Sequence, residues 1–254
     1  STNFTVGLGG KLSKNVSFTV DYYKIDVKDR VIYTNQIGKN QFFINGFDTT
    51  TSGIDFVSGI SNIELGAGKL ALNLSGNYTI ENKNTEDVPT IVVEGAEYDV
   101  LDRSNLALMF TSRPKTKWIL GANYDLDKFG VSLNNTYFGK TTFKQKFMSE
   151  NLRTEFIPKV ITDLAINFNA TDKLTIAFNV NNLFNILPEW EFKAENIAGQ
   201  AIINDTRLTS SGLTQLQNES NAITFNQRYS QMTYDGSHFS QLGTMFNLSL
   251  NYKF

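Results

Sequence analysis

The stretch MFNLSLNYKF, residues 245–254, alternates apolar or aromatic side chains with mostly polar ones up to its last residue. A period of two is typical of a β-strand that has one apolar and one polar face. The apolar row, which decides the fold, consists of Phe246, Leu248, Leu250, Tyr252 and Phe254. The segment therefore predicts a strand that separates a hydrophobic environment from a wet one.

The same alternation recurs along the rest of the chain. It is clearest in residues 174–184, where Leu174, Ile176 and Phe178 alternate with Thr175 and Ala177. Together with the terminal segment 242–254, it predicts nine strands, the other eight being 3–10, 16–25, 49–60, 69–80, 117–126, 130–140, 159–169 and 174–184. Their length of about 10–12 residues exceeds the roughly 5–6 of an average strand. It suits the roughly 9–11 that a tilted transmembrane strand needs.

The connections between these segments alternate in length. Short ones occur at 11–14, 61–67, 127–129 and 170–173, and long ones at 27–47, 81–114, 141–158 and 185–241. Membrane barrels show this alternation, with short periplasmic turns and long extracellular loops. Residues 103–112 (RSNLALMFTS) could form a tenth strand, but counting them would break the rhythm. We therefore expect a locally ordered piece within the second long loop.

The composition of the chain argues against several classes of protein. The 254 residues carry a net charge of -2 with a mean hydropathy of -0.24, and no cysteine is present. No apolar run reaches the roughly 18 residues of a transmembrane helix, and the balanced charge gives no case for nucleic acid as a partner. With His238 as the single histidine, the sequence predicts no enzyme, no metal site and no cofactor.

Nine strands are an odd number, whereas complete bacterial barrels have an even one. Such a sheet would also leave two open edges, which lipid does not tolerate. We therefore expect an all-β fold in which residues 1–254 are one partial domain, the C-terminal segment of a larger antiparallel transmembrane β-barrel.

The terminal strand also resembles the C-terminal signal that the outer-membrane barrel assembly machinery recognises. An edge strand with free backbone groups can be bound by β-augmentation. The alternative interpretation is an ordinary last strand of a soluble sandwich.

Several motifs, in this order and spacing, resemble TonB-dependent outer-membrane receptors, especially those of Bacteroidetes-like bacteria. They cover nearly the whole chain and comprise TTSGIDF (50–56), SRPKTKWILGANYDLDKFGVSLNNTYFGK (112–140), NVNNLFN (179–185) and YDGSHFSQLGTMFNLSLNYKF (234–254).

This resemblance implies a 22-stranded barrel closed by an N-terminal plug, in the outer membrane of a Gram-negative bacterium. It implies uptake of a scarce small-molecule ligand, powered by TonB through the plug. The implied partners are outer-membrane lipid, the assembly machinery and the rest of the receptor. The plug, the TonB-contacting segment and the earlier strands are not found in this sequence. The ligand class stays open between iron chelates, cobalamin-like compounds and glycans.

The longest loop, 185–241, is too long to be only a connector and is rich in Asn, Gln, Ser and Thr. Its motif PEWEF (188–192) supplies the candidate ligand-binding residues Glu189, Trp190 and Glu191. Trp190 is either a stacking platform for a ligand or an anchor in the aromatic girdle of the membrane interface.

Two other hypotheses remain at this point. One is a complete ten-stranded barrel with omptin-like protease activity, which would use residues 103–112 as a strand and His238 at its top. The other is a soluble β-sandwich that binds a ligand.

Overall fold

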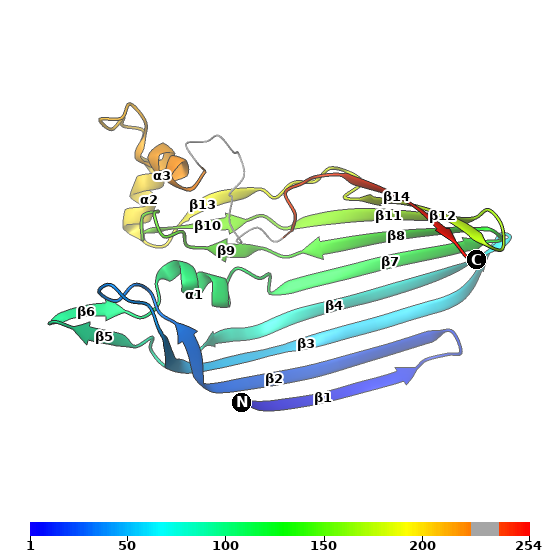
Figure 1. Cartoon of the computed structure of the whole chain (residues 1–254), viewed down its shortest axis with the longest axis horizontal. Coiled ribbons are helices and arrows are strands. Elements are labelled where there is room, and N and C mark those ends of the chain that lie inside the picture. The colour runs from blue at the N-terminus through cyan, green and yellow to red at the C-terminus, as the bar shows by residue number, and fades with distance from the viewer. Residues whose placement is uncertain (225–238) are drawn as a thin grey trace.

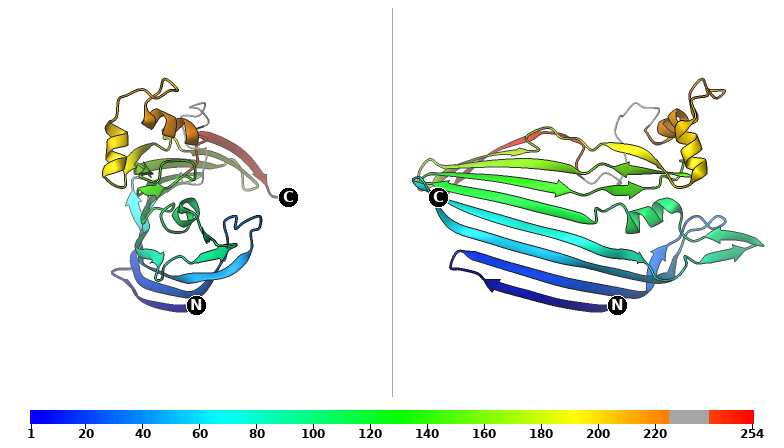
Figure 2. Two further views of the ribbon diagram at one scale, coloured as in Figure 1. Left: turned by 90° about the vertical axis from the view of Figure 1, so that its left-hand side faces the viewer. Right: turned by 180° about the vertical axis from the view of Figure 1, so that it is seen from behind.

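The computed structural model describes residues 1–224 and 239–254. Nine strands form one antiparallel sheet in which spatial order follows chain order, and the sheet curves into an open half-cylinder (Figures 1 and 2). Its strands are β1 (Thr2–Lys11), β2 (Val16–Tyr33), β3 (Phe43–Leu65), β4 (Gly68–Asn84), β7 (Thr116–Leu126), β8 (Phe129–Phe138), β11 (Lys159–Asn169), β12 (Leu174–Asn181) and β14 (Met245–Tyr252). The prediction of nine antiparallel strands is confirmed.

Three strands are longer than the sequence predicts. β2, β3 and β4 contain 18, 23 and 17 residues, so parts of the expected loops 27–47 and 81–114 belong to strands. The β2–β3 ladder continues through a bulge at Asp29, whose backbone N–H donates to Asp48 Oδ1 at 2.8 Å. Apolar alternation fades where a strand leaves lipid, but backbone pairing does not depend on it. The expected strand ends were therefore wrong for β2–β4.

One face of the sheet is apolar across all nine strands. The register places Leu8 opposite Val20 and Val20 opposite Phe56, and it places Phe178 opposite Leu248 at the other side of the sheet. Exposed side chains on this face include Phe4, Val6, Leu8, Val20, Ile54, Tyr78, Leu120, Phe129, Tyr137, Val160, Phe178, Phe246, Leu248, Leu250 and Tyr252. In a barrel, such a face is the one that contacts lipid.

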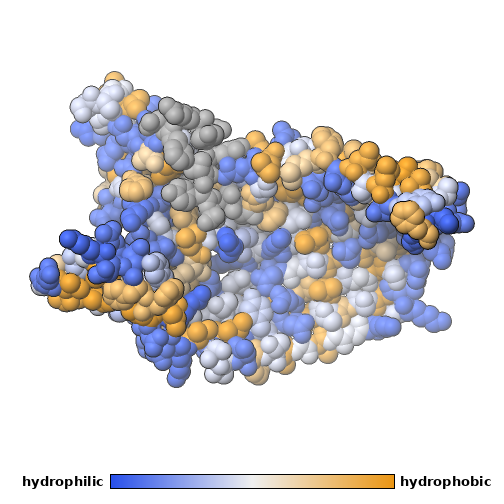
Figure 3. All heavy atoms as spheres, viewed as in Figure 1, coloured by the Kyte–Doolittle hydropathy of each residue, from blue (hydrophilic) through white to orange (hydrophobic). Residues whose placement is uncertain are grey.

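The other face is polar and lies on the concave side, which Figure 3 shows with hydrophilic residues across much of the hollow. Asn77 Nδ2 donates to Asp55 Oδ1 at 2.6 Å and to the Tyr23 hydroxyl at 3.2 Å. Gly121 leaves room for two amide side chains, because a Cβ there would collide with Asn73 and Asn134. This face therefore carries a layer of amides suited to a hydrated interior.

The remaining elements stand beyond one end of the main sheet (Figure 1). They are the hairpin β5 (Thr90–Val93) and β6 (Ala96–Asp99), the sheet of β9 (Thr141–Phe143), β10 (Leu152–Phe156) and β13 (Trp190–Ala194), and the helices α1 (Arg103–Phe110), α2 (Ile197–Asn204) and α3 (Gln215–Ile223). At the opposite end, strands are joined by short turns. No helix within the described residues is long and apolar enough to cross a membrane.

Residues 103–110 are helical, so the alternative of a tenth strand there is wrong. Asp102 caps the helix by accepting a hydrogen bond from the Asn105 backbone N–H at 2.9 Å, as Asp does at helix N-termini. α1 lies near the end of β4 (Figure 1), where Asn82 Nδ2 donates to the Met109 carbonyl at 3.0 Å. The expectation of a locally ordered piece inside this loop is confirmed.

Two hydrophobic clusters stabilise the elements beyond the sheet. One joins the β2–β3 extension to the hairpin and α1 through Ile32, Phe47 and Val100. The other joins β10 to α2 and α3 through Leu152, Phe156, Met148, Ile202 and Ile223. The long loops are therefore small folded units with their own cores.

We expect Gly76→Ala to destabilise the sheet by about 1–3 kcal/mol, the usual cost of overpacking. Gly76 lies on the apolar face beneath the Trp118 ring, and a Cβ there would collide with the ring. Chemical denaturation of the protein in detergent, followed by tryptophan fluorescence, measures the effect. Gly59→Ala is the matched control because its Cβ would meet only ordinary contacts. Equal midpoints for the two variants would contradict the prediction.

Candidate functional site

The face of the β9–β10–β13 sheet opposite its hydrophobic cluster is covered by ion pairs. Lys140 pairs with Glu155 at 3.3 Å, and Glu195, just beyond β13, accepts from both Arg153 at 3.0 Å and Lys144 at 3.2 Å. Burial disfavours the charged form of Glu195, but the hydrogen bonds from Arg153 and Lys144 outweigh it and hold its pKa below the usual range. The charges on this face largely neutralise one another.

Trp190 begins β13 and packs against the cluster of Phe156, Leu152 and Ile202. Its ring meets that of Phe192 edge-on, with centroids 5.3 Å apart. The indole is half-buried, so part of it is available to a ligand. Its role in ligand binding stays a prediction.

The two carboxylates beside Trp190 already have partners. Glu189 lies 2.8 Å from Lys159 Nζ, and Glu191 lies 2.9 Å from Lys193 Nζ. The Glu191–Lys193 pair is solvent-accessible, and such pairs contribute about 0–1 kcal/mol, whereas the Lys159 side chain is mostly buried. A ligand could therefore displace Lys193 at little cost.

A second feature was missed by sequence reasoning. A cavity of about 160 Å³ opens on the concave face where β8, β11, β12 and β14 end or begin. Phe138 and Phe239 line it with ring centroids 5.4 Å apart, and Lys117 Nζ lies 5.0 Å above the Phe138 ring. Asp163 and Asn181 are among the polar residues that line it. These residues are far apart in sequence, and only the register of the strands brings them together.

The NVNNLFN motif forms a hydrogen-bonded turn at the edge of this cavity. Asn182 adopts a positive φ of 54°, and its side chain both donates to the Ile186 carbonyl (2.7 Å) and accepts from the Ile186 N–H (2.8 Å). Its backbone N–H donates to Asp163 Oδ1 at 2.7 Å. Thr244 Oγ1 donates to the Asn182 carbonyl at 2.7 Å. The turn therefore fastens the start of the longest loop to its end.

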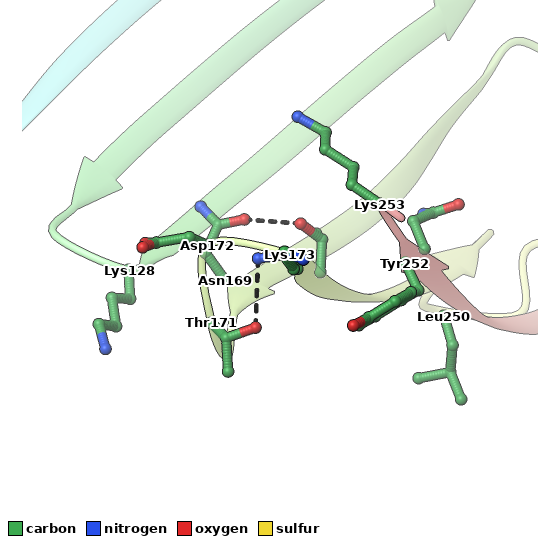
Figure 4. Close-up of a pocket in the computed structure, with 10 residues that line it drawn as sticks. Lys128, Asn169, Thr171, Asp172, Lys173, Leu250, Tyr252 and Lys253 are labelled. Atoms are coloured by element: carbon green, nitrogen blue, oxygen red, sulfur yellow. Dashed lines mark hydrogen bonds between the residues drawn. The ribbon is translucent and has the colours of Figure 1, made fainter.

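A cavity of about 620 Å³ lies at the opposite end of the sheet, beside the turn 170–173 and the end of β14 (Figure 4). Its Lys128 and Lys253 side chains point away from one another, and Thr175 Oγ1 already donates to Asn169 Oδ1 at 2.9 Å. Because its charged groups do not converge, we do not assign a ligand to it.

The described parts of the chain contain no cluster of His, Asp and Glu side chains that could hold a metal ion. His238, which the protease hypothesis requires, lies outside the described residues.

Comparison with protein families decides the class of this fold. The family described as TonB dependent receptor-like, beta-barrel, matches residues 1–183. The chain belongs to this family. The receptor is therefore a protein of the outer membrane of Gram-negative bacteria and not an enzyme, which removes the omptin-like and soluble-sandwich hypotheses.

Solved structures agree on the fold of the receptor. The siderophore receptor PirA from Acinetobacter baumannii matches 99% of the chain with a TM-score of 0.58 and 12% identity. The FrpB iron transporter from Neisseria meningitidis (F3-3 variant) matches 99% with a TM-score of 0.56 and 13% identity. The chain spans 31% and 30% of their lengths. Comparison with curated proteins found no match.

We expect Asn182→Ala to release the loop that follows β12. The change removes two side-chain hydrogen bonds at a buried position and puts alanine at a positive φ that asparagine tolerates better. Limited proteolysis of the folded receptor should cleave the 186–243 segment several-fold faster. Asn181→Ala is the control, since its exposed side chain lies outside the turn. Unchanged cleavage in Asn182→Ala would show that the turn does not fasten the loop.

Proposed function

We propose that this chain supplies C-terminal strands of a transporter that binds a scarce ligand at its extracellular loops and imports it with energy from TonB. The observation that carries the proposal is the asymmetry of the sheet. Every folded loop stands at one end and every short turn at the other, around a polar concave face. This is the arrangement of a barrel that captures a molecule outside and passes it through a hydrated interior.

The domain proposal follows from the two edges of the sheet. β1 and β14 each pair on one side only. Backbone groups within lipid must be hydrogen-bonded, so further strands of a larger barrel would close the gap. A plug against the polar face would link the receptor to TonB, and lipid would cover the apolar face.

The ligand would meet Trp190, Glu189 and Glu191 at the extracellular end. The exposed part of the indole supplies a stacking surface, Glu189 precedes it, and Glu191 follows it on β13 with its side chain toward the ion-paired face. The matched proteins named above are an iron transporter and a siderophore receptor. An iron chelate is therefore the first ligand class to test.

The uptake experiment uses the full-length receptor in its own cells with radiolabelled ferric chelates. We expect uptake to stop when TonB is deleted, and Trp190→Ala to weaken binding about tenfold through loss of stacking. Phe192→Ala is the control, because Phe192 packs on the same cluster. An equal loss of binding affinity in both variants would show that Trp190 has only a structural role. Uptake without TonB would overturn the proposed mechanism.

The row Phe246, Leu248, Leu250, Tyr252 and Phe254 would also act as the signal for barrel assembly. These side chains are all exposed on the apolar face or beyond its end, and β14 has a free edge for an assembly partner. Phe254 lies past the end of β14 and contacts Tyr252 edge-on at 5.3 Å. It contributes little to packing, so an effect of its removal would reflect recognition.

We expect Phe254→Ala to lower the amount of folded receptor in the outer membrane several-fold. Mobility of unheated samples on denaturing gels measures folded barrels. Leu12→Ala is the matched control, because Leu12 is also a largely exposed apolar residue just past the end of a strand, β1, at the same end of the sheet. Normal assembly of the Phe254 variant would exclude the signal.

A further inference from the structure

A cavity of about 270 Å³ lies where β7 begins, at the extracellular end of the sheet. Three of the residues that line it are cations, Arg113, Lys115 and Lys140. Tyr78 and Phe110 add aromatic surface. The cavity beside Phe138, by contrast, has no cation in its lining.

The segment that carries Arg113 and Lys115 is fixed to strands on both sides. On one side, Thr142 N–H donates to the Thr111 carbonyl at 3.1 Å, and Thr111 Oγ1 donates back to the Thr142 carbonyl at 2.7 Å. On the other, Thr79 N–H donates to the Lys115 carbonyl at 2.7 Å. The two cations are therefore held on a rigid wall and not on a free loop.

Register brings the third cation to the same place. Gly139 N–H donates to the Thr116 carbonyl at 2.9 Å, so Lys140 on one strand meets the segment 112–115 on the other. Trp118 Nε1 donates to Thr116 Oγ1 at 2.8 Å, and Thr116 lines the cavity. The indole of Trp118 is thus one hydrogen bond from the cavity.

The charge of this cavity is not balanced. Lys140 pairs with Glu155 at 3.3 Å, whereas within the described residues Arg113 and Lys115 form no ion pair. Arg113 only donates to the Ser112 carbonyl at 3.5 Å. The neighbouring cations Lys144, Arg153, Lys159 and Lys193 all have carboxylate partners. Within the described residues, Arg113 and Lys115 are therefore free to bind a ligand.

Free guanidinium and ammonium groups beside apolar surface favour an oxyanion, because charge-assisted hydrogen bonds are the strong ones and apolar walls reduce screening. Arg is suited to bidentate binding of carboxylate or phosphate. We propose that Arg113, Lys115 and Lys140 form an oxyanion-binding site, which takes a carboxylate or phosphate group of the molecule that the receptor captures.

This inference rests on the proposed function and narrows its ligand to an anionic molecule. Phosphate of a membrane glycolipid has the same chemistry and is the second possible source. Tyr78 and Thr116, which line the cavity, belong to the apolar face of the sheet that lipid would cover. A lipid phosphate could therefore reach the cavity, and the test must separate the two sources.

The experiment titrates inorganic phosphate and citrate into the full-length receptor in neutral detergent, by calorimetry and by tryptophan fluorescence. We expect saturable binding that weakens with salt, and a loss of at least tenfold in Arg113→Gln/Lys115→Gln. Lys193→Gln is the matched control, because it removes a lysine that is paired with Glu191. Gel mobility of unheated samples verifies that each variant is folded.

A second arm measures binding of the receptor to phosphatidylcholine vesicles with and without lipopolysaccharide. Dependence on Arg113 and Lys115 in this arm alone would support the site with lipid as its source. Binding that is equal in wild type and double variant in both arms, or absent from both, would overturn it. If the receptor imports its ligand but binds no oxyanion, this inference is wrong and the proposed function stands. If it binds oxyanions but imports its ligand without TonB, the proposed function is wrong and this inference stands.

Discussion

The structure depends on one constraint, which is that a strand in lipid must have every backbone polar group hydrogen-bonded to a neighbouring strand. The seven strands between β1 and β14 meet this requirement by pairing on both sides, whereas β1 and β14 each pair on one side only. The same geometry sends alternate side chains to opposite faces, so Leu8, Val20 and Phe56 align on one side while Asp21 and Asp55 align on the other. A lipid-facing surface and a hydrated surface therefore arise from a single pattern.

That constraint also explains which parts of the fold the sequence predicts. Within the membrane, one face of each strand meets lipid and the other meets water, so apolar and polar side chains must alternate. The nine strands and their order could therefore be predicted from residues such as Leu174, Ile176 and Phe178. Beyond lipid, the alternation is no longer required, although pairing continues through β3 up to Phe43. Residues 103–110 contain Leu, Met and Ala that suit either a strand or a helix, and the Asp102 cap decides for the helix.

The candidate site was less predictable because its parts come together through register and packing. Trp190 was predicted as a site residue from its place in the longest loop. Its packing on Phe156 and Ile202 was not predicted. In the sequence, Arg113 precedes the β7–β8 hairpin and Lys140 follows it. They border one cavity because Thr116 pairs with Gly139. A sequence shows the charges of such residues but not which ones lack a partner.

The elements beyond the loop end of the sheet are also joined to one another, and Arg103 of α1 has the central position. Its Nη2 donates to the Leu152 carbonyl at 2.6 Å, while Ser104 Oγ of the same helix donates to the Lys144 carbonyl at 2.8 Å. Glu219 of α3 accepts from the Ser149 N–H at 2.7 Å. Burial lowers the pKa of the Arg103 guanidinium, although Glu195 opposes this. Three loops thus share the segment 144–152, so a ligand that moves one of them acts on backbone hydrogen bonds of the other two.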